Sequence, residues 1–142
     1  MSIAILAAPD GARFGAHGLP REVVSQLVER ASQAGKTVAV CSCRNASDIL
    51  DRLRRLDGRS TEFLLLDPGP DAHVGGELDA ALNLVGVPYI EVHADRTGSF
   101  ERVGTPLNVI DGYGAQGYVL ALSIALEWLG CTECENDIHV GT

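Results

Sequence analysis

Short apolar runs alternate with amphipathic segments along the whole chain. Five runs are bounded by turn residues and are typical of strands buried in a parallel sheet; they cover residues 3–7, 37–41, 63–66, 87–92 and 107–110. Between them, apolar residues recur at helical spacing in segments 20–35, 45–56, 77–85 and 114–129. This alternation predicts an α/β fold with a doubly wound parallel five-stranded sheet, strand order 2-1-3-4-5, and four to five helices.

The last helical segment differs from the others because it is apolar on nearly every side. Residues 118–126 contain no charged side chain. A helix with this pattern is buried on more than one side. We therefore expect the last helix to lie at an interface between subunits.

The third run stops abruptly at polar residues. Phe63 to Leu66 is followed by Asp67, two prolines, a glycine, Asp71 and then His73. In open α/β sheets, ligands bind beyond the carboxyl ends of the strands. The loops after strands one, three and four converge on that edge, and their polar residues are Asp10, Arg13, His17, Asp67, Asp71, His73, Glu91, His93, Asp95 and Arg96. These side chains predict an acid–base site; the alternative, polar filling of ordinary loops, stays open.

Length and charge narrow the class of protein. A chain of 142 residues suits one domain over 1–142, with a terminal tail over 130–142. The net charge of −8 argues against nucleic acid or an anionic membrane as the main partner. No apolar run approaches the length of a membrane span, and the start lacks the basic region of a signal peptide. We expect a cytoplasmic protein with no membrane partner.

Two further motifs have alternative interpretations. Cys131 and Cys134 have the spacing of a zinc or redox pair, whereas Cys41 and Cys43 fit small apolar residues of a strand. Residues 112–117 match G-x-G-x-x-G between a strand and a helix. No strand follows to complete a nucleotide-binding unit, so this motif indicates a tight turn and close helix–sheet packing.

Three segments together resemble type II 3-dehydroquinate dehydratases. They are Asp67-Pro68-Gly69-x-x-x-His73, Glu91-Val92-His93, and Gly112-x-Gly114-x-x-Gly117-Tyr118 with the helix after it. The resemblance extends over nearly the whole chain. It implies a flavodoxin-like fold, a dodecamer built from four trimers, and removal of water from 3-dehydroquinate without a metal or cofactor.

The resemblance implies that the acid half of the family's site is kept. His93 matches the histidine that protonates the departing hydroxyl, and Glu91 matches the glutamate that orients it. Their i, i+2 spacing points both side chains to the same side of a strand. His73 matches the histidine that holds the substrate.

The base half departs from the family's pattern. Ala7-Ala8-Pro9-Asp10 replaces Asn-Gly-Pro-Asn, and the loop after it holds no tyrosine. His17, Asp10 and Asp67 are then the candidate bases. Asp67 replaces an asparagine, Asp95 a serine and Arg96 an asparagine. The expected substrate-binding residues are Asp67, His73, Ala94, Asp95, Arg96, Arg13 and Arg102.

Two interpretations of this pattern compete. The favoured one is a repurposed lyase that acts on another small molecule, neutral or amine-bearing, through His93 and Glu91. The other is a non-catalytic homologue that binds a ligand or stabilises an assembly.

We predict that the protein is not an efficient 3-dehydroquinate dehydratase. Aspartates at positions 67 and 95 would repel the substrate carboxylate, and a like-charge pair about 4 Å apart costs about 4 kcal/mol, or roughly a thousandfold in affinity. A steady-state assay with 3-dehydroquinate should show little turnover. Ordinary turnover would contradict the prediction.

Overall fold

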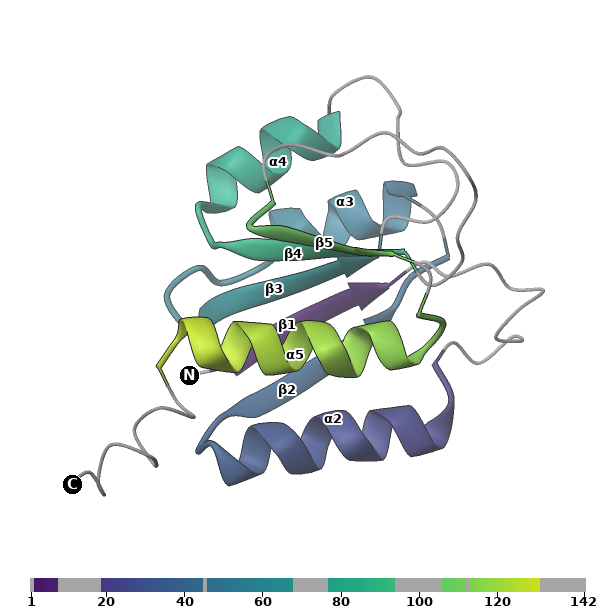
Figure 1. Ribbon diagram of the computed structural model, residues 1–142. Helices are drawn as coiled ribbons and strands as arrows, with labels where there is room; N and C mark the ends of the chain where they lie inside the picture. The colour runs from purple at the N-terminus through teal and green to yellow at the C-terminus, as the bar shows by residue number, and fades with distance from the viewer. Residues whose placement is uncertain are drawn as a thin grey trace.

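Five parallel strands form one sheet in the order β2-β1-β3-β4-β5, as the sequence predicts. A computed structural model describes residues 2–7, 19–44, 46–67, 77–93, 106–111 and 113–130. The strands are β1 (Ser2–Ala7), β2 (Thr37–Ser42), β3 (Thr61–Asp67), β4 (Tyr89–His93) and β5 (Asn108–Asp111). The sheet is flavodoxin-like, with β3 at its centre (Figure 1).

Two layers of helices cover the sheet. Helices α2 (Arg21–Gln33) and α5 (Gln116–Trp128) lie on one face. Helices α3 (Ala46–Arg54) and α4 (Glu77–Val85) lie on the other, as Figure 1 shows. None of the described helices combines the length and apolarity that a bilayer crossing requires.

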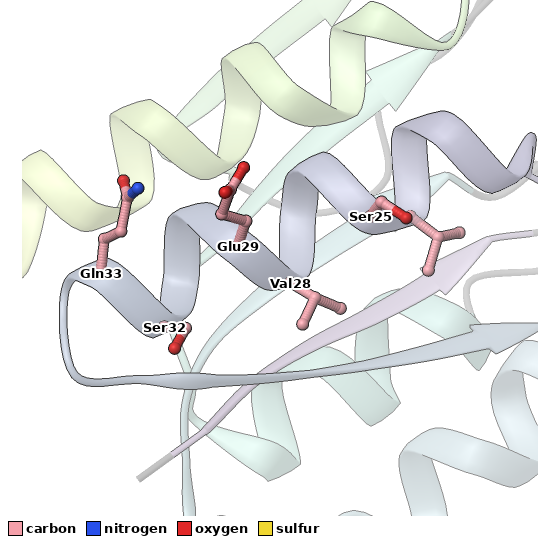
Figure 2. A pocket seen from close by; sticks show the side chains of 6 residues that line it. Ser25, Val28, Glu29, Ser32 and Gln33 are labelled. Carbon is pink, nitrogen blue, oxygen red and sulfur yellow. The ribbon is translucent and has the colours of Figure 1, made fainter.

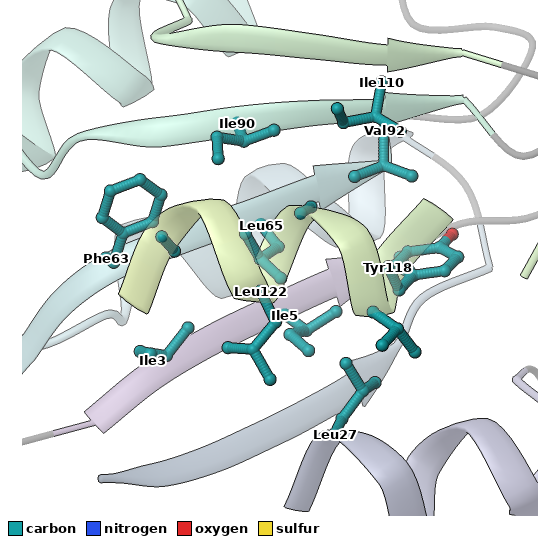
Figure 3. Packing of buried hydrophobic residues seen from close by; sticks show 14 of the residues in the cluster. Ile3, Ile5, Leu27, Phe63, Leu65, Ile90, Val92, Ile110, Tyr118 and Leu122 are labelled. Atoms are coloured by element: carbon teal, nitrogen blue, oxygen red, sulfur yellow. The ribbon is translucent and has the colours of Figure 1, made fainter. Parts of the chain in front are cut away.

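Strand β3 contributes to the core on both faces. Phe63 and Leu65 pack with α2 and α5, and Figure 3 shows these side chains beside those of α5. Leu64 and Leu66 point the opposite way and pack with α3 and α4. All four are fully buried. Because successive side chains of a strand alternate between faces, this one run links the two halves of the core.

Helix α5 lies against the sheet through its first turn. A Cβ built on Gly117 would lie 3.3 Å from Val92 Cγ1 and 3.5 Å from Ile110 Cγ2. The turn before the helix contains Gly114 at φ +60°, a conformation that side chains other than glycine rarely adopt. The glycine-rich segment therefore provides the tight turn and close packing that the sequence predicts.

Element boundaries differ from the sequence predictions by a few residues. Strand β4 begins at Tyr89 rather than 87, because Pro88 has no N–H for a strand ladder. Helix α3 begins at Ala46 and ends at Arg54, two residues before the predicted end, and Asn45 is outside the described residues. The expected tail over 130–142 lies, beyond Gly130, outside the described part and stays a prediction.

Burial of Leu122 in α5 should contribute to the stability of the fold. Leu122 is fully buried, whereas Leu84 of α4 is 87% exposed. We expect Leu122→Ala to lower the free energy of unfolding by about 2–5 kcal/mol, since it leaves a cavity. The matched change Leu84→Ala should stay within about 0.5 kcal/mol. Urea denaturation of both variants tests this, and equal losses would contradict it.

Candidate active site

Glu91 and His93 form a dyad at the carboxyl end of β4. They alternate with Val92 along the strand, and so share a face with Tyr89, which packs in the cluster with α3 and α4. His93 Nε2 lies 2.7 Å from Glu91 Oε1. The Glu91 side chain is fully buried, and the His93 side chain is 12% exposed. The structure thus brings together the two residues expected to act as an acid and its orienting partner.

The contact fixes which histidine nitrogen faces the carboxylate. A carboxylate that faces a ring N–H accepts its hydrogen bond, so a His93 with its proton on Nε2 donates to Glu91 Oε1. The second nitrogen, Nδ1, then carries the proton that the ring gains and gives up. A partly exposed histidine held in this way is suited to donating a proton to a ligand.

Asp67 ends β3 on the opposite face of the sheet. The Tyr118 hydroxyl of α5 donates a hydrogen bond to Asp67 Oδ2. Asp67 is 4% exposed and Tyr118 is fully buried. The carboxylate therefore points toward α5, whereas the dyad points toward α3 and α4. The substrate-binding role expected of Asp67 stays a prediction, and Tyr118 is a structural partner that the sequence analysis did not identify.

Burial determines the chemistry of Tyr118. Desolvation, the Asp67 charge and the hydrogen bond to Asp67 raise the Tyr118 pKa well above its ordinary value of 10.0. Tyr118 is therefore a neutral donor and not a base at neutral pH. The chain has three tyrosines. Tyr89 is buried like Tyr118, whereas Tyr113 is exposed.

The cysteines of β2 and its end behave as small apolar residues. Cys41 and Cys43 are both free thiols, and Cys43 is buried. Desolvation and the nearby Asp48 charge raise the Cys43 pKa from 9.0 to about 11, so the thiol stays protonated at neutral pH. Within the described ranges, no three His, Cys, Asp or Glu side chains gather into a group that could hold a metal ion.

Most of the other predicted site residues lie outside the described residues, and their roles stay predictions. These are Asp10, Arg13, His17, Asp71, His73, Ala94, Asp95, Arg96 and Arg102, together with Cys131 and Cys134.

One surface hollow is separate from the dyad. Figure 2 shows it on α2, lined by residues that include Ser25, Val28, Glu29 and Gln33. It is open to solvent and offers one carboxylate and no histidine. Since α2 covers the sheet face opposite the dyad, this hollow does not belong to the candidate site.

A carboxylate–histidine pair at the carboxyl edge of a flavodoxin-like sheet defines a class of acid–base α/β protein. Comparison with known families identifies the class more closely. The class II dehydroquinase family model matches residues 3–126. The chain belongs to the type II dehydroquinase family.

Relatives and solved structures agree with this assignment. The 3-dehydroquinate dehydratase of Pseudomonas savastanoi pv. phaseolicola is 30% identical over 126 residues, covering 84% of this chain and 83% of its own. The catabolic 3-dehydroquinase of Debaryomyces hansenii is 27% identical over 113 residues, covering 75% of this chain and 78% of its own. The structure of a 3-dehydroquinate dehydratase-like protein from Bifidobacterium longum has a TM-score of 0.67 at 21% identity, covering 92% of this chain and 99% of its own. The type II dehydroquinase from Propionibacterium acnes also has a TM-score of 0.67, at 23% identity, covering 87% and 96%. The two structures share the fold.

Removing the Tyr118 hydroxyl should destabilise the protein. Tyr118→Phe leaves the buried Asp67 carboxylate without this donor, and we expect a loss of about 2 kcal/mol in the free energy of unfolding at pH 8. Tyr113→Phe, at a tyrosine that is 61% exposed, is the matched control and should stay within about 0.5 kcal/mol.

The Tyr118 effect should also depend on pH. Folding raises the Tyr118 pKa above its ordinary value of 10.0. The stabilising contribution of the Tyr118 hydroxyl is therefore full below pH 10.0, and it declines as the pH rises from there through the folded-state pKa. The difference between wild type and Tyr118→Phe should therefore shrink at pH 11. A difference that grows with pH would contradict the assignment.

Proposed function

We propose that the protein is a lyase-type enzyme that removes water from a small molecule other than 3-dehydroquinate. The observation that carries the proposal is the buried Glu91 carboxylate held 2.7 Å from a partly exposed histidine. Buried ion pairs contribute little net stability compared with apolar residues of similar size. A fold that keeps one at the ligand-binding edge of its sheet has a chemical use for it.

In the proposed reaction, a base removes the proton beside a carbonyl group and an enolate forms. The protonated His93 then donates a proton to the departing hydroxyl, which leaves as water, and Glu91 holds the ring in place. Asp10 or His17 is the proposed base, because these residues occupy the segment that matches the family's base loop. The proposed substrate contacts are His73, Ala94, Asp95, Arg96, Arg13 and Arg102, and no cofactor takes part.

Two features of the chain favour a substrate other than 3-dehydroquinate. Residues 8–18 contain no tyrosine, and buried Tyr89 and Tyr118 cannot replace one. Asp67 accepts a hydrogen bond from Tyr118 on the other face of the sheet, so the proposal does not rely on the charge of Asp67. The repulsion of a substrate carboxylate then rests on Asp95. A neutral or amine-bearing substrate fits that charge better. We also propose that the chain forms a homo-oligomer built from trimers, because the family resemblance implies such an assembly.

The proposal can be tested with substitutions in the dyad. Purified protein is incubated with a panel of small β-hydroxy ketones, neutral and amine-bearing, and loss of water is followed by mass spectrometry. For a substrate found in this way, His93→Gln should lower kcat by about 10²- to 10⁴-fold, the usual contribution of a general acid. Glu91→Gln should lower kcat at least about tenfold, because the ring loses its carboxylate partner.

Exposed Glu22 of α2 provides the matched control, and Glu22→Gln should leave turnover unchanged. Turnover that survives His93→Gln would contradict the acid role. Ligand binding without turnover anywhere in the panel would favour the non-catalytic alternative.

A further inference from the structure

A group of arginines lies where the chain passes from α3 to β3. Segment 44–59 holds five of the chain's eleven basic residues and three of its nineteen acidic ones. Arg54 ends α3, and Arg55 and Arg59 lie in the loop that enters β3. All three are exposed, and we call them the arginine cluster. On a protein with a net charge of −8, the arginine cluster is a local reversal of sign.

The nearby acids leave the guanidinium groups of the arginine cluster available. Asp57 Oδ1 accepts a hydrogen bond from the backbone N–H of Arg59 at 2.9 Å. Arg55 Nε donates to the backbone oxygen of Asp51 at 3.4 Å. Within the described ranges, no carboxylate forms an ion pair with these three arginines. Guanidinium groups bind carboxylates in a fork of two hydrogen bonds, so the arginine cluster suits an acidic segment.

Helix α5 ends close to the arginine cluster. Trp128 is the last residue of α5, and its ring meets that of Phe63 in β3 edge to face, with centroids 5.6 Å apart. Strand β3 begins two residues after Arg59. Figure 1 shows the loop that enters β3 and the last turn of α5 at the same end of the sheet. The segment that follows α5 therefore starts at the edge where the arginine cluster lies.

The segment after α5 has the opposite charge. Residues 131–142 lie outside the described residues, and their sequence contains Glu133, Glu135 and Asp137 but no lysine or arginine. Twelve extended residues span up to about 40 Å. The path from the α5 side of the sheet to the α3 side is roughly 20 Å, because each layer is about 10 Å thick. The segment is long enough to reach the arginine cluster.

We infer that residues 131–142 dock on the arginine cluster of the same chain through Glu133, Glu135 and Asp137. A tethered segment meets the cluster at a millimolar effective concentration. A separate polyanion, such as a nucleic acid, is repelled by the net charge of −8 before it arrives. The inference goes beyond the proposed reaction and does not depend on it, since the arginine cluster and the dyad lie at opposite edges of the sheet.

Salt should control this docking. Ion pairs between exposed side chains are weak, and they are screened by dissolved ions. The Debye length is about 30 Å at 0.01 M salt and about 3 Å at 1 M salt. We therefore expect the segment to be docked at low ionic strength and released at about 1 M salt.

Arginine modification by phenylglyoxal measures the docking directly. The full chain is treated with the reagent at low salt and at high salt, and peptide mapping by mass spectrometry gives a rate for each arginine. The rates at Arg54, Arg55 and Arg59 should rise about threefold at high salt, the change expected if the segment covers them about two thirds of the time. The rates at exposed Arg21 and Arg44 should not change relative to each other.

Neutralising the acidic segment should have the same effect at low salt. The triple variant Glu133→Gln, Glu135→Gln and Asp137→Asn should raise the rates at the arginine cluster about threefold, because nothing then covers it. Glu22→Gln with Glu29→Gln changes two exposed acids of α2 and should leave the rates unchanged. Circular dichroism checks that each variant is folded.

Three outcomes would overturn the inference. The arginine cluster could react as fast at low salt as at high salt in the wild type. Its rates could stay low in the triple variant, which would mean that the three acids do not cover it. Protection that falls as the protein is diluted would mean that a second copy supplies the segment.

Discussion

Side-chain alternation on neighbouring parallel strands determines which polar residues of this protein can meet. Leu66 of β3 pairs in register with Glu91 of β4, and both belong to the sheet face under α3 and α4. One residue further along β3, Asp67 is on the other face with Tyr118. Asp67 and Glu91, two acids on adjacent strands, therefore point to different sides of the sheet. This constraint separates the Glu91–His93 dyad from the buried pair of Asp67 and Tyr118.

The buried pair and the glycine turn together hold α5 at the carboxyl edge. Tyr118 reaches the end of β3, while Gly117 allows the helix to approach Val92 of β4 and Ile110 of β5. Val92 directly precedes His93. The first turn of α5 thus contacts the ends of three strands, next to the position of His93. Replacing the family's asparagine by Asp67 fits this structural role, because a carboxylate accepts a stronger hydrogen bond from a phenol than an amide does.

The sequence allowed most of the fold to be predicted, because short apolar runs bounded by turn residues alternate with helical segments. The order of the strands, the helix over 77–85 and the two-sided burial of β3 are confirmed. The contact of Glu91 with His93 followed from their spacing on a strand. The contact of Asp67 with Tyr118 could not be predicted in this way, because 51 residues separate the two. The periodicity of a helix does not show where that helix packs on the sheet. Two features of the sequence could have indicated this contact. Asp67 ends a buried strand, and Tyr118 lies in the first turn of a helix.

We propose that Glu91 fixes His93 in the form suited to donate a proton from Nδ1. The most direct measurement is a ¹⁵N NMR spectrum of the imidazole side chains, with His93 assigned by comparison with His93→Gln. We predict that neutral His93 is the Nε2–H tautomer in the wild type, and that Glu91→Ala loses this preference. A wild-type His93 with its proton on Nδ1 in the neutral form would contradict the account.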